Sequence, residues 1–165
     1  MNNELTAQDI QKMQEELDYR RLELMPELIE EVKRTRAFGD LSENYEYKAA
    51  KQAQNANKKR IRYLTRMIES AQVIEDTSAE DEVGLFDLVE LYLEEDDDTE
   101  TVQVVTTVRC DPRQGRVSKE SPMGRALLGK KLGDRFQVEV SPSYSYYAVV
   151  RSIQKQSDDG SAPIL

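Results

Sequence analysis

The sequence predicts an α+β protein in which a long antiparallel coiled-coil hairpin of helices precedes a smaller domain. Residues 6–36 and 43–70 carry apolar side chains every three or four positions, which is typical of helices that pack along one face. From about residue 72 the period changes to two, and β-branched and aromatic residues accumulate as in strands. We therefore expect the second domain to be an antiparallel β-sheet with one short helix.

The change of period also sets the expected domain boundaries. The hairpin is expected to occupy residues 1–75 and the β-rich domain residues 76–153. Residues 154–165 are polar and contain Gly, Ser and Pro, so we expect a disordered tail there.

The first helix is expected to begin after Thr6 and to run to about Arg36. Pro26 lies inside this segment and has no backbone donor, which predicts a kink rather than a break. Thirty helical residues would rise about 45 Å. The apolar seam of this helix consists of Ile10, Met13, Leu17, Leu24 and Leu28.

The second helix is expected to begin near Ser42 or Glu43 and to end near Ser70. Gly39 favours a turn before it, and Asp40 can cap it. Its seam is small or polar near the turn and aliphatic further along, which predicts a hairpin that is firm at its base and thinner at its tip. The seam residues are Tyr47, Ala50, Gln54, Asn57, Ile61, Leu64, Ile68 and Ala71.

Strands and one helix are expected in the second domain. Ser121-Pro122 predicts the start of a short helix through Leu128, and Gly129 predicts its end. A turn at Gly133-Asp134 is expected before the fourth strand. The expected strands are residues 73–74, 85–91, 101–108, 136–140 and 146–153.

The composition excludes several functional classes. The chain has no histidine, which excludes Ser-His-Asp and Cys-His catalysis and histidine-bound metals. Cys110 is the only cysteine, so an internal disulfide and a thiolate-rich zinc site are also excluded. No apolar run reaches the roughly 18–20 residues that a membrane span needs. We expect a soluble, cytoplasmic monomer with no membrane partner.

Two carboxylates lie in the turn between the helices. Asp40 and Glu43 stand three residues apart, so both can gather at the tip of the hairpin. Mg²⁺ is commonly held by one or two carboxylates, with water or phosphate completing its shell. The remaining ligands would have to come from another molecule. The alternative reading of the spacing alone is an N-cap and its partner at the third helical position.

Two stretches of the chain resemble signatures of the bacterial Gre transcription cleavage factors, and they favour the GreA branch. The first is Gly39-Asp40-Leu41-Ser42-Glu43-Asn44-Tyr45-Glu46-Tyr47, followed by Ala49-Ala50-Lys51. The second is Ser121-Pro122-Met123-Gly124-Arg125-Ala126-Leu127-Leu128-Gly129. The resemblance covers about residues 5–153. It implies an N-terminal coiled coil and a C-terminal domain similar to FKBP.

The resemblance also implies a function. Such proteins bind bacterial RNA polymerase, and their coiled coil reaches through the secondary channel to the active centre. The acidic pair of the family corresponds to Asp40 and Glu43, which would help hold the second Mg²⁺ and its attacking water. The polymerase then cleaves the 3′ end of the backtracked nascent RNA. The protein would be an accessory factor rather than an enzyme, with no cofactor of its own beyond this shared Mg²⁺.

A basic stripe lies within this acidic protein, whose net charge is −9. No acid occurs from Tyr47 to Ile68, and seven cations do: Lys48, Lys51, Lys58, Lys59, Arg60, Arg62 and Arg66. One interpretation is a solvated face that balances the acidic first helix through pairs between the helices. The other is a patch that contacts phosphates of the RNA 3′ segment, formed by Lys51, Lys58, Lys59 and Arg62.

The second signature predicts a helix whose main role is structural and which also contributes to polymerase docking. The residues expected to contact the partner are Ser121, Pro122, Met123, Arg125 and Leu127.

Four features depart from the family pattern. Tyr45 stands where a small residue is common, and Phe86 stands where Gly is frequent. The segment Thr106–Asp111 lacks the usual Gly and carries Arg109 where an acid is frequent, and the C-terminal extension is unmatched.

Two other functions compete with transcript cleavage. The likeness to FKBP raises prolyl isomerisation, but the chain has no Trp and only three Phe with which to line a pocket. The second is a non-catalytic competitor that occupies the secondary channel and inhibits or modulates the polymerase. The tip has the two-acid pattern of cleavage factors, and Tyr45 leaves this alternative open.

Overall fold

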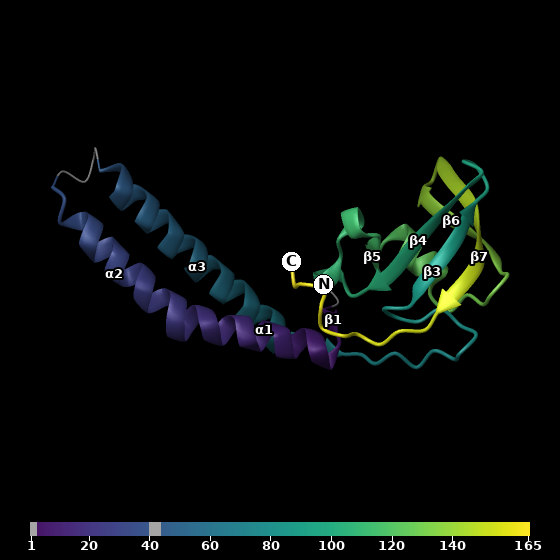
Figure 1. The fold of residues 1–165 in the computed structure, drawn as a ribbon, viewed down its shortest axis with the longest axis horizontal. Helices are drawn as coiled ribbons and strands as arrows, with labels where there is room; N and C mark the ends of the chain where they lie inside the picture. The colour runs from purple at the N-terminus through teal and green to yellow at the C-terminus, as the bar shows by residue number, and fades with distance from the viewer. Residues whose placement is uncertain (1–2, 40–43) are drawn as a thin grey trace. The chain divides into compact units, whose positions relative to one another are not determined.

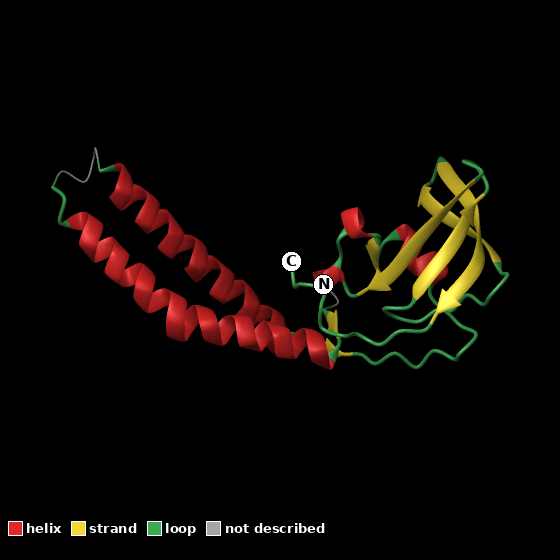
Figure 2. Cartoon of the chain, viewed as in Figure 1, coloured by secondary structure: helices red, strands yellow, loops and turns green. Residues whose placement is uncertain are grey.

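The computed structural model describes residues 3–39 and 44–165 and confirms the α+β class (Figures 1 and 2). The chain forms two compact units, one of Asp9–Gln72 with the first residues, the other of Glu4–Gln8 and Val73–Leu165. The division after Gln72 lies close to the expected boundary. Residues 4–8 join the second unit because β1 (Glu4–Leu5) pairs with β2 (Gln72–Val73). Among the described residues, no helix is long and apolar enough to cross a membrane.

The first helical stretch of the hairpin unit is continuous but irregular. It comprises α1 (Ala7–Tyr19), a π-helical turn (Arg20–Leu24) and α2 (Met25–Arg36). Pro26 cannot donate to the carbonyl of Leu22, and its ring crowds that carbonyl. The chain responds with a wider turn, in which the Met25 amide donates to the Arg20 carbonyl. The helix axis changes direction there, as the proline predicted (Figure 1).

The second helix, α3 (Tyr45–Glu69), runs antiparallel beside α2 and starts later than expected (Figure 1). Its N-cap is Asn44, whose side chain accepts a hydrogen bond from the Tyr47 amide. The capping role that the sequence assigned to Asp40 is therefore filled by Asn44. Asp40 and Glu43 themselves lie outside the described residues.

The hairpin seam changes from apolar to polar along its length, as predicted. Met13, Leu17 and Leu64 are buried towards the base of the hairpin, and Gln54 and Asn57 are buried further towards the tip. Asn57 accepts from the Arg20 guanidinium at 2.9 Å and donates to the Arg20 carbonyl at 3.1 Å. The π-helical turn thus supplies a backbone partner for a polar seam residue of α3.

The second unit is built on a five-stranded sheet in the order β5-β4-β3-β7-β6. Its strands are β3 (Leu88–Leu93), β4 (Asp98–Val105), β5 (Arg116–Ser118), β6 (Arg135–Ser141) and β7 (Tyr144–Gln154). Three of the four strand pairings are antiparallel, as expected, and β5 differs because it pairs with β4 in parallel. Two 3₁₀ turns, Thr107–Arg109 and Pro112–Gln114, bring the chain back alongside β4 in the same direction.

The short helix α4 (Pro122–Leu127) is where the sequence predicted it. The Ser121 hydroxyl caps it by accepting from the Gly124 amide at 3.0 Å. Gly129 follows with φ +82°, a left-handed conformation that favours glycine. Leu127 belongs to the core cluster of the sheet, together with Val89, Leu91 and Val104.

Phe86 has a left-handed backbone, with φ +67°. This conformation is incompatible with an extended strand, so β3 begins at Leu88 rather than at the expected residue 85. A residue without a side chain would adopt the same backbone more easily, which gives a physical reason for the glycine that is frequent here in the family pattern.

The C-terminal segment differs from the expectation of a disordered tail. The buried Arg109 guanidinium donates to both carboxylate oxygens of Asp158, at 2.9 and 2.6 Å, and lies over the Phe86 ring at 5.2 Å. The Leu165 amide donates to the Val108 carbonyl at 2.9 Å. A buried guanidinium needs an anion, and the tail supplies it.

Candidate functional site

The part of the hairpin unit that the sequence predicts to be functional lies where α2 ends and α3 begins. We call residues 31–38 and 44–51 the neck. Asp40 and Glu43, the acids predicted to share Mg²⁺, lie between the two segments of the neck and outside the described residues. The described neck defines how the chain enters and leaves that tip.

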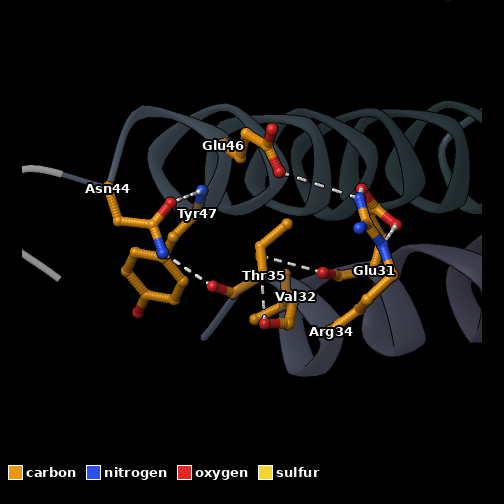
Figure 3. A network of polar contacts seen from close by, with 7 residues as sticks. All are labelled: Glu31, Val32, Arg34, Thr35, Asn44, Glu46 and Tyr47. Atoms are coloured by element: carbon orange, nitrogen blue, oxygen red, sulfur yellow. Dashed lines mark hydrogen bonds and ion pairs between the residues drawn. The ribbon is translucent and has the colours of Figure 1, made fainter. Parts of the chain in front are cut away.

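Asn44 joins the two helices at the neck (Figure 3). Its side-chain oxygen accepts from the Tyr47 amide at 3.0 Å, which caps α3. Its side-chain nitrogen donates to the Thr35 carbonyl at 2.6 Å, in the last turn of α2. The Asn44 side chain therefore pairs with an amide of α3 that has no partner within its own helix and with a carbonyl of α2. These two hydrogen bonds hold the ends of the helices together.

Thr35 provides a rigid anchor for that contact. Its side chain is buried, and its hydroxyl lies within hydrogen-bonding distance of the Glu31 carbonyl at 2.9 Å and the Val32 carbonyl at 3.2 Å (Figure 3). Its carbonyl also accepts from the Phe38 amide at 3.2 Å. The end of α2 is thus held by several bonds before the chain reaches the tip.

The described charges of the neck are mainly positive. Arg34 donates to both carboxylate oxygens of Glu31, at 2.9 and 2.6 Å, and its guanidinium lies 4.0 Å from Glu46 (Figure 3). The hydrogen bond from Arg34 is the main cause that lowers the pKa of Glu31. Glu46 is largely exposed, as expected of a solvated residue, and Arg34 is its ion-pair partner.

The four basic residues predicted to contact RNA lie along α3. Lys58, Lys59 and Arg62 are exposed, and the half-buried Lys51 donates to Gln54 at 3.2 Å. Spacings of seven and four residues place Lys51, Lys58 and Arg62 on one side of the helix. Lys59 and Arg62 also line a shallow surface hollow, together with Ala56, Arg60, Tyr63 and Arg66.

The pairing of the hairpin charges bears on the two interpretations of this stripe. Among the described residues, none of the four pairs with an acid of the first helical stretch. Arg60 does so instead, donating to Glu16 at 2.8 and 3.1 Å, and Arg20 also donates to Glu16 at 2.8 Å. In the described part of the hairpin, Arg60 is therefore the cation of α3 that pairs with an acid of the first helical stretch.

The second signature divides into structural and exposed residues. Leu127 is fully buried, so its predicted contact with a partner was wrong: the folded core encloses the side chain. Ser121 is a cap, and Met123 packs partly against the core. Arg125 is exposed, and with Pro122 it lines a surface hollow that also includes Ala126, Gln137 and Glu139.

No cluster of three or more Asp, Glu, Cys or His side chains suited to a metal is found in residues 3–39 and 44–165.

Comparisons with known proteins match both units. A family model described as transcription elongation factor, N-terminal, matches residues 3–73. A second, described as transcription elongation factor, GreA/GreB, C-terminal, matches residues 78–154. A helical hairpin and a small mixed-sheet unit, matched in this order, define a bacterial transcription elongation factor. The chain belongs to the GreA/GreB family.

Two relatives named GreA agree with this assignment. Transcription elongation factor GreA of Thermoanaerobacter pseudethanolicus is 40% identical over 137 residues, which cover 82% of this chain and 87% of that protein. GreA of Bacillus subtilis is 38% identical over 135 residues, which cover 82% and 86%. The solved structure of GreA factor homolog 1 (Gfh1) of Thermus thermophilus is 26% identical and covers 94% of this chain and 100% of that one, with a TM-score of 0.43.

Proposed function

We propose that this protein binds bacterial RNA polymerase, inserts its hairpin into the secondary channel, and stimulates cleavage of the nascent RNA 3′ end in backtracked complexes. The observation that carries the proposal is the neck. Asn44 holds the ends of α2 and α3 together, and Asp40 and Glu43 belong to the segment of the sequence that joins these two ends.

Asp40 and Glu43 would supply two carboxylates to a Mg²⁺ whose other ligands belong to the polymerase and the RNA. Carboxylates are the protein ligands that Mg²⁺ prefers, and two are too few for a complete shell. The bound ion would activate a water for hydrolysis of the phosphodiester bond and stabilise the leaving oxygen. The role of this chain is to deliver and orient the acids, and the polymerase provides the remaining active site.

The basic stripe would hold the backtracked RNA segment. Lys51, Lys58, Lys59 and Arg62 lack acidic partners among the described residues, and phosphate contacts position a strand without reading its sequence. In the second unit, the exposed Arg125 and the half-buried Pro122 of the second signature are proposed to contact the polymerase. The protein would act in the cytoplasm as a monomer.

The experiment is RNA cleavage in purified, stalled elongation complexes of the cognate polymerase with Mg²⁺. The native chain is compared with Asp40→Asn and Glu43→Gln at equal occupancy, and with Glu46→Gln as a matched loss of a nearby exposed carboxylate. We expect the native chain and Glu46→Gln to release short 3′ fragments, and each tip variant to lower the rate by at least about a hundredfold, because metal-bound water is lost.

A second candidate function is a channel competitor without cleavage activity. Tyr45 favours it, because its side chain is 81% exposed directly beside the tip, where a bulky ring can obstruct the approach to a reacting phosphate. The same experiment separates the two functions. A native chain that binds and slows RNA synthesis without releasing fragments would be a competitor.

A further inference from the structure

Aromatic rings and cations alternate around the neck. The Arg34 guanidinium lies 5.3 Å from the centre of the Phe38 ring, and the Lys48 ammonium lies 5.5 Å from that of Tyr45. A third pair places Arg36 at 5.7 Å from the Tyr47 ring, and a hydrogen bond from Arg36 lowers the pKa of the Tyr47 hydroxyl. We call these six residues the neck collar: Arg34, Arg36, Phe38, Tyr45, Tyr47 and Lys48.

Two rings of the collar are exposed without a packing role. Tyr45 is 81% exposed and Phe38 is 56% exposed. Asn44, rather than Tyr45, caps α3, and the half-buried Tyr47 is the ring that lies on the seam. Tyrosine, which combines an apolar ring with a polar hydroxyl, is enriched where proteins contact other molecules.

The charges of the neck collar indicate which kind of molecule it would bind. Its ionised groups are cations, of which Arg34 is already paired with Glu31 and Glu46. Lys48 and Lys51 follow Tyr45 at intervals of three residues, at the start of the acid-free basic stripe. A flat ring beside a cation fits a nucleotide, because the base can stack on the ring while the phosphate meets the cation. An acidic peptide would use the cations but would leave the ring faces without a partner.

We propose that the neck collar binds an unpaired ribonucleotide, with its base stacked on Tyr45 and its phosphate on Lys48. The following phosphates would continue along Lys51, Lys58 and Arg62. This inference deepens the proposed function, on which its place in transcription rests. It makes Tyr45 a binding residue for the RNA 3′ segment rather than an obstruction, and Phe38 supplies a second exposed ring at the other side of the tip.

The test measures RNA binding by the full chain without polymerase. The probe is a single-stranded oligoribonucleotide with fluorescent 2-aminopurine as its 3′ nucleotide, at low salt. We expect the native protein to quench this base on binding. Tyr45→Leu, which keeps an apolar side chain but no ring, should weaken binding by about tenfold, in line with the loss of one base–aromatic contact. Tyr45→Phe should retain native affinity.

Two controls make the result specific. Tyr144→Leu removes another exposed tyrosine, 47% exposed and located in the second unit, and should bind as the native chain does. An oligoribonucleotide with an abasic 3′ end, carrying a label elsewhere, should bind the native chain and Tyr45→Leu equally, because it has no base to stack.

Three results would overturn the inference: no quenching by the native chain, equal affinity of native protein and Tyr45→Leu for the 2-aminopurine probe, or the same loss with the abasic probe. A Tyr45-dependent competition by an oligoglutamate peptide would also contradict it and indicate an acidic peptide ligand. Because the binding experiment contains no polymerase, a negative result in it does not contradict the proposed stimulation of cleavage. A negative cleavage experiment likewise does not affect the interpretation of the RNA-binding result.

Discussion

The ion pairs described above for the two units differ in how deeply their charged side chains are buried. In the hairpin unit, the paired charges around Glu16 are partly exposed, and those of the neck are largely so. In the sheet unit, Arg109 and Asp87 are fully buried. Exposed pairs contribute little to stability, whereas removal of one partner from a buried pair leaves a charge without compensation.

The C-terminal segment supplies the partners of both buried charges in the sheet unit. Asp158 pairs with Arg109, and the Lys155 ammonium donates to the Asp87 carboxylate at 2.7 Å. Asp87 also accepts from the Gly84 amide at 2.7 Å and the Gln156 amide at 2.9 Å. The sheet unit therefore depends on these buried pairs for stability, whereas the exposed pairs of the hairpin neck contribute little.

The largest effect is expected at Leu127 in the core of the sheet unit. Leu127→Ala should lower the free energy of unfolding of this unit by about 4 kcal/mol, because it leaves a cavity in a fully buried site. Hydrogen exchange of the β3 and β4 amides measures the loss. Arg125→Ala, on the exposed side of α4, is the matched control and should change exchange little. Equal effects of the two variants would show that α4 does not divide into a buried and an exposed side.

The next effect tests the buried pair. Asp158→Ala should destabilise the sheet unit by about 3 kcal/mol, because the buried Arg109 guanidinium loses both hydrogen bonds to this carboxylate. Urea unfolding followed by hydrogen exchange in β4 provides the measurement. Asp159→Ala removes the neighbouring exposed carboxylate and should cost much less. If truncation after Gln154 left the stability unchanged, the tail would not be part of the fold.

A smaller effect is expected at Asn44. Asn44→Ala should lower the stability of the hairpin by about 1–2 kcal/mol, because it removes both the cap of α3 and the bond to α2. Asn44→Asp keeps an acceptor for the cap but cannot donate to the Thr35 carbonyl. It should preserve the start of α3, seen in amide exchange, while lowering transcript cleavage. Asn55→Ala, at an exposed position of α3, serves as the control.

The smallest effect is the pH dependence of the hairpin. Burial raises the pKa of Glu16, but hydrogen bonds and charges from Arg60 and Arg20 outweigh it and lower the pKa below 4.5. Protonation of a group with a lowered pKa removes stability, so the pair contributes above pH 4.5 and is lost as the pH falls through the folded pKa. For this partly exposed group we expect about 0.5 kcal/mol. Glu16→Gln should reduce the loss of helicity between pH 5 and pH 3, whereas an unchanged acid transition would exclude this pair as its cause.

Periodicity was sufficient to predict the two helices, the kink at Pro26 and the polar gradient of the seam, because each depends on residues close in sequence. The ends of α4 followed from Ser121 and Gly129 for the same reason. The sequence could not predict the parallel pairing of β5, since three residues carry too little pattern. The sequence also did not predict that the tail packs on the sheet unit, because Asp158 and its partner Arg109 are 49 residues apart in the sequence.

Some features of the candidate site could be predicted from the sequence, and others could not. The basic stripe was visible as an acid-free run, but only the structure separates Arg60, which pairs with Glu16, from the four residues without acidic partners among those described. The double role of Asn44 was missed because its second partner lies in the other helix. The one local signal was an amide side chain near the expected start of the second helix, directly after Glu43.

The most direct test of the central claim is the Mg²⁺ dependence of cleavage in stalled complexes. If Asp40 and Glu43 supply ligands to the second Mg²⁺, the native chain should lower the Mg²⁺ concentration that gives half-maximal cleavage by about tenfold or more relative to polymerase alone. Asp40→Asn and Glu43→Gln should each abolish most of that shift while still binding the polymerase. A native chain that accelerates cleavage with no change in the Mg²⁺ midpoint, or tip variants that retain the full shift, would contradict the account.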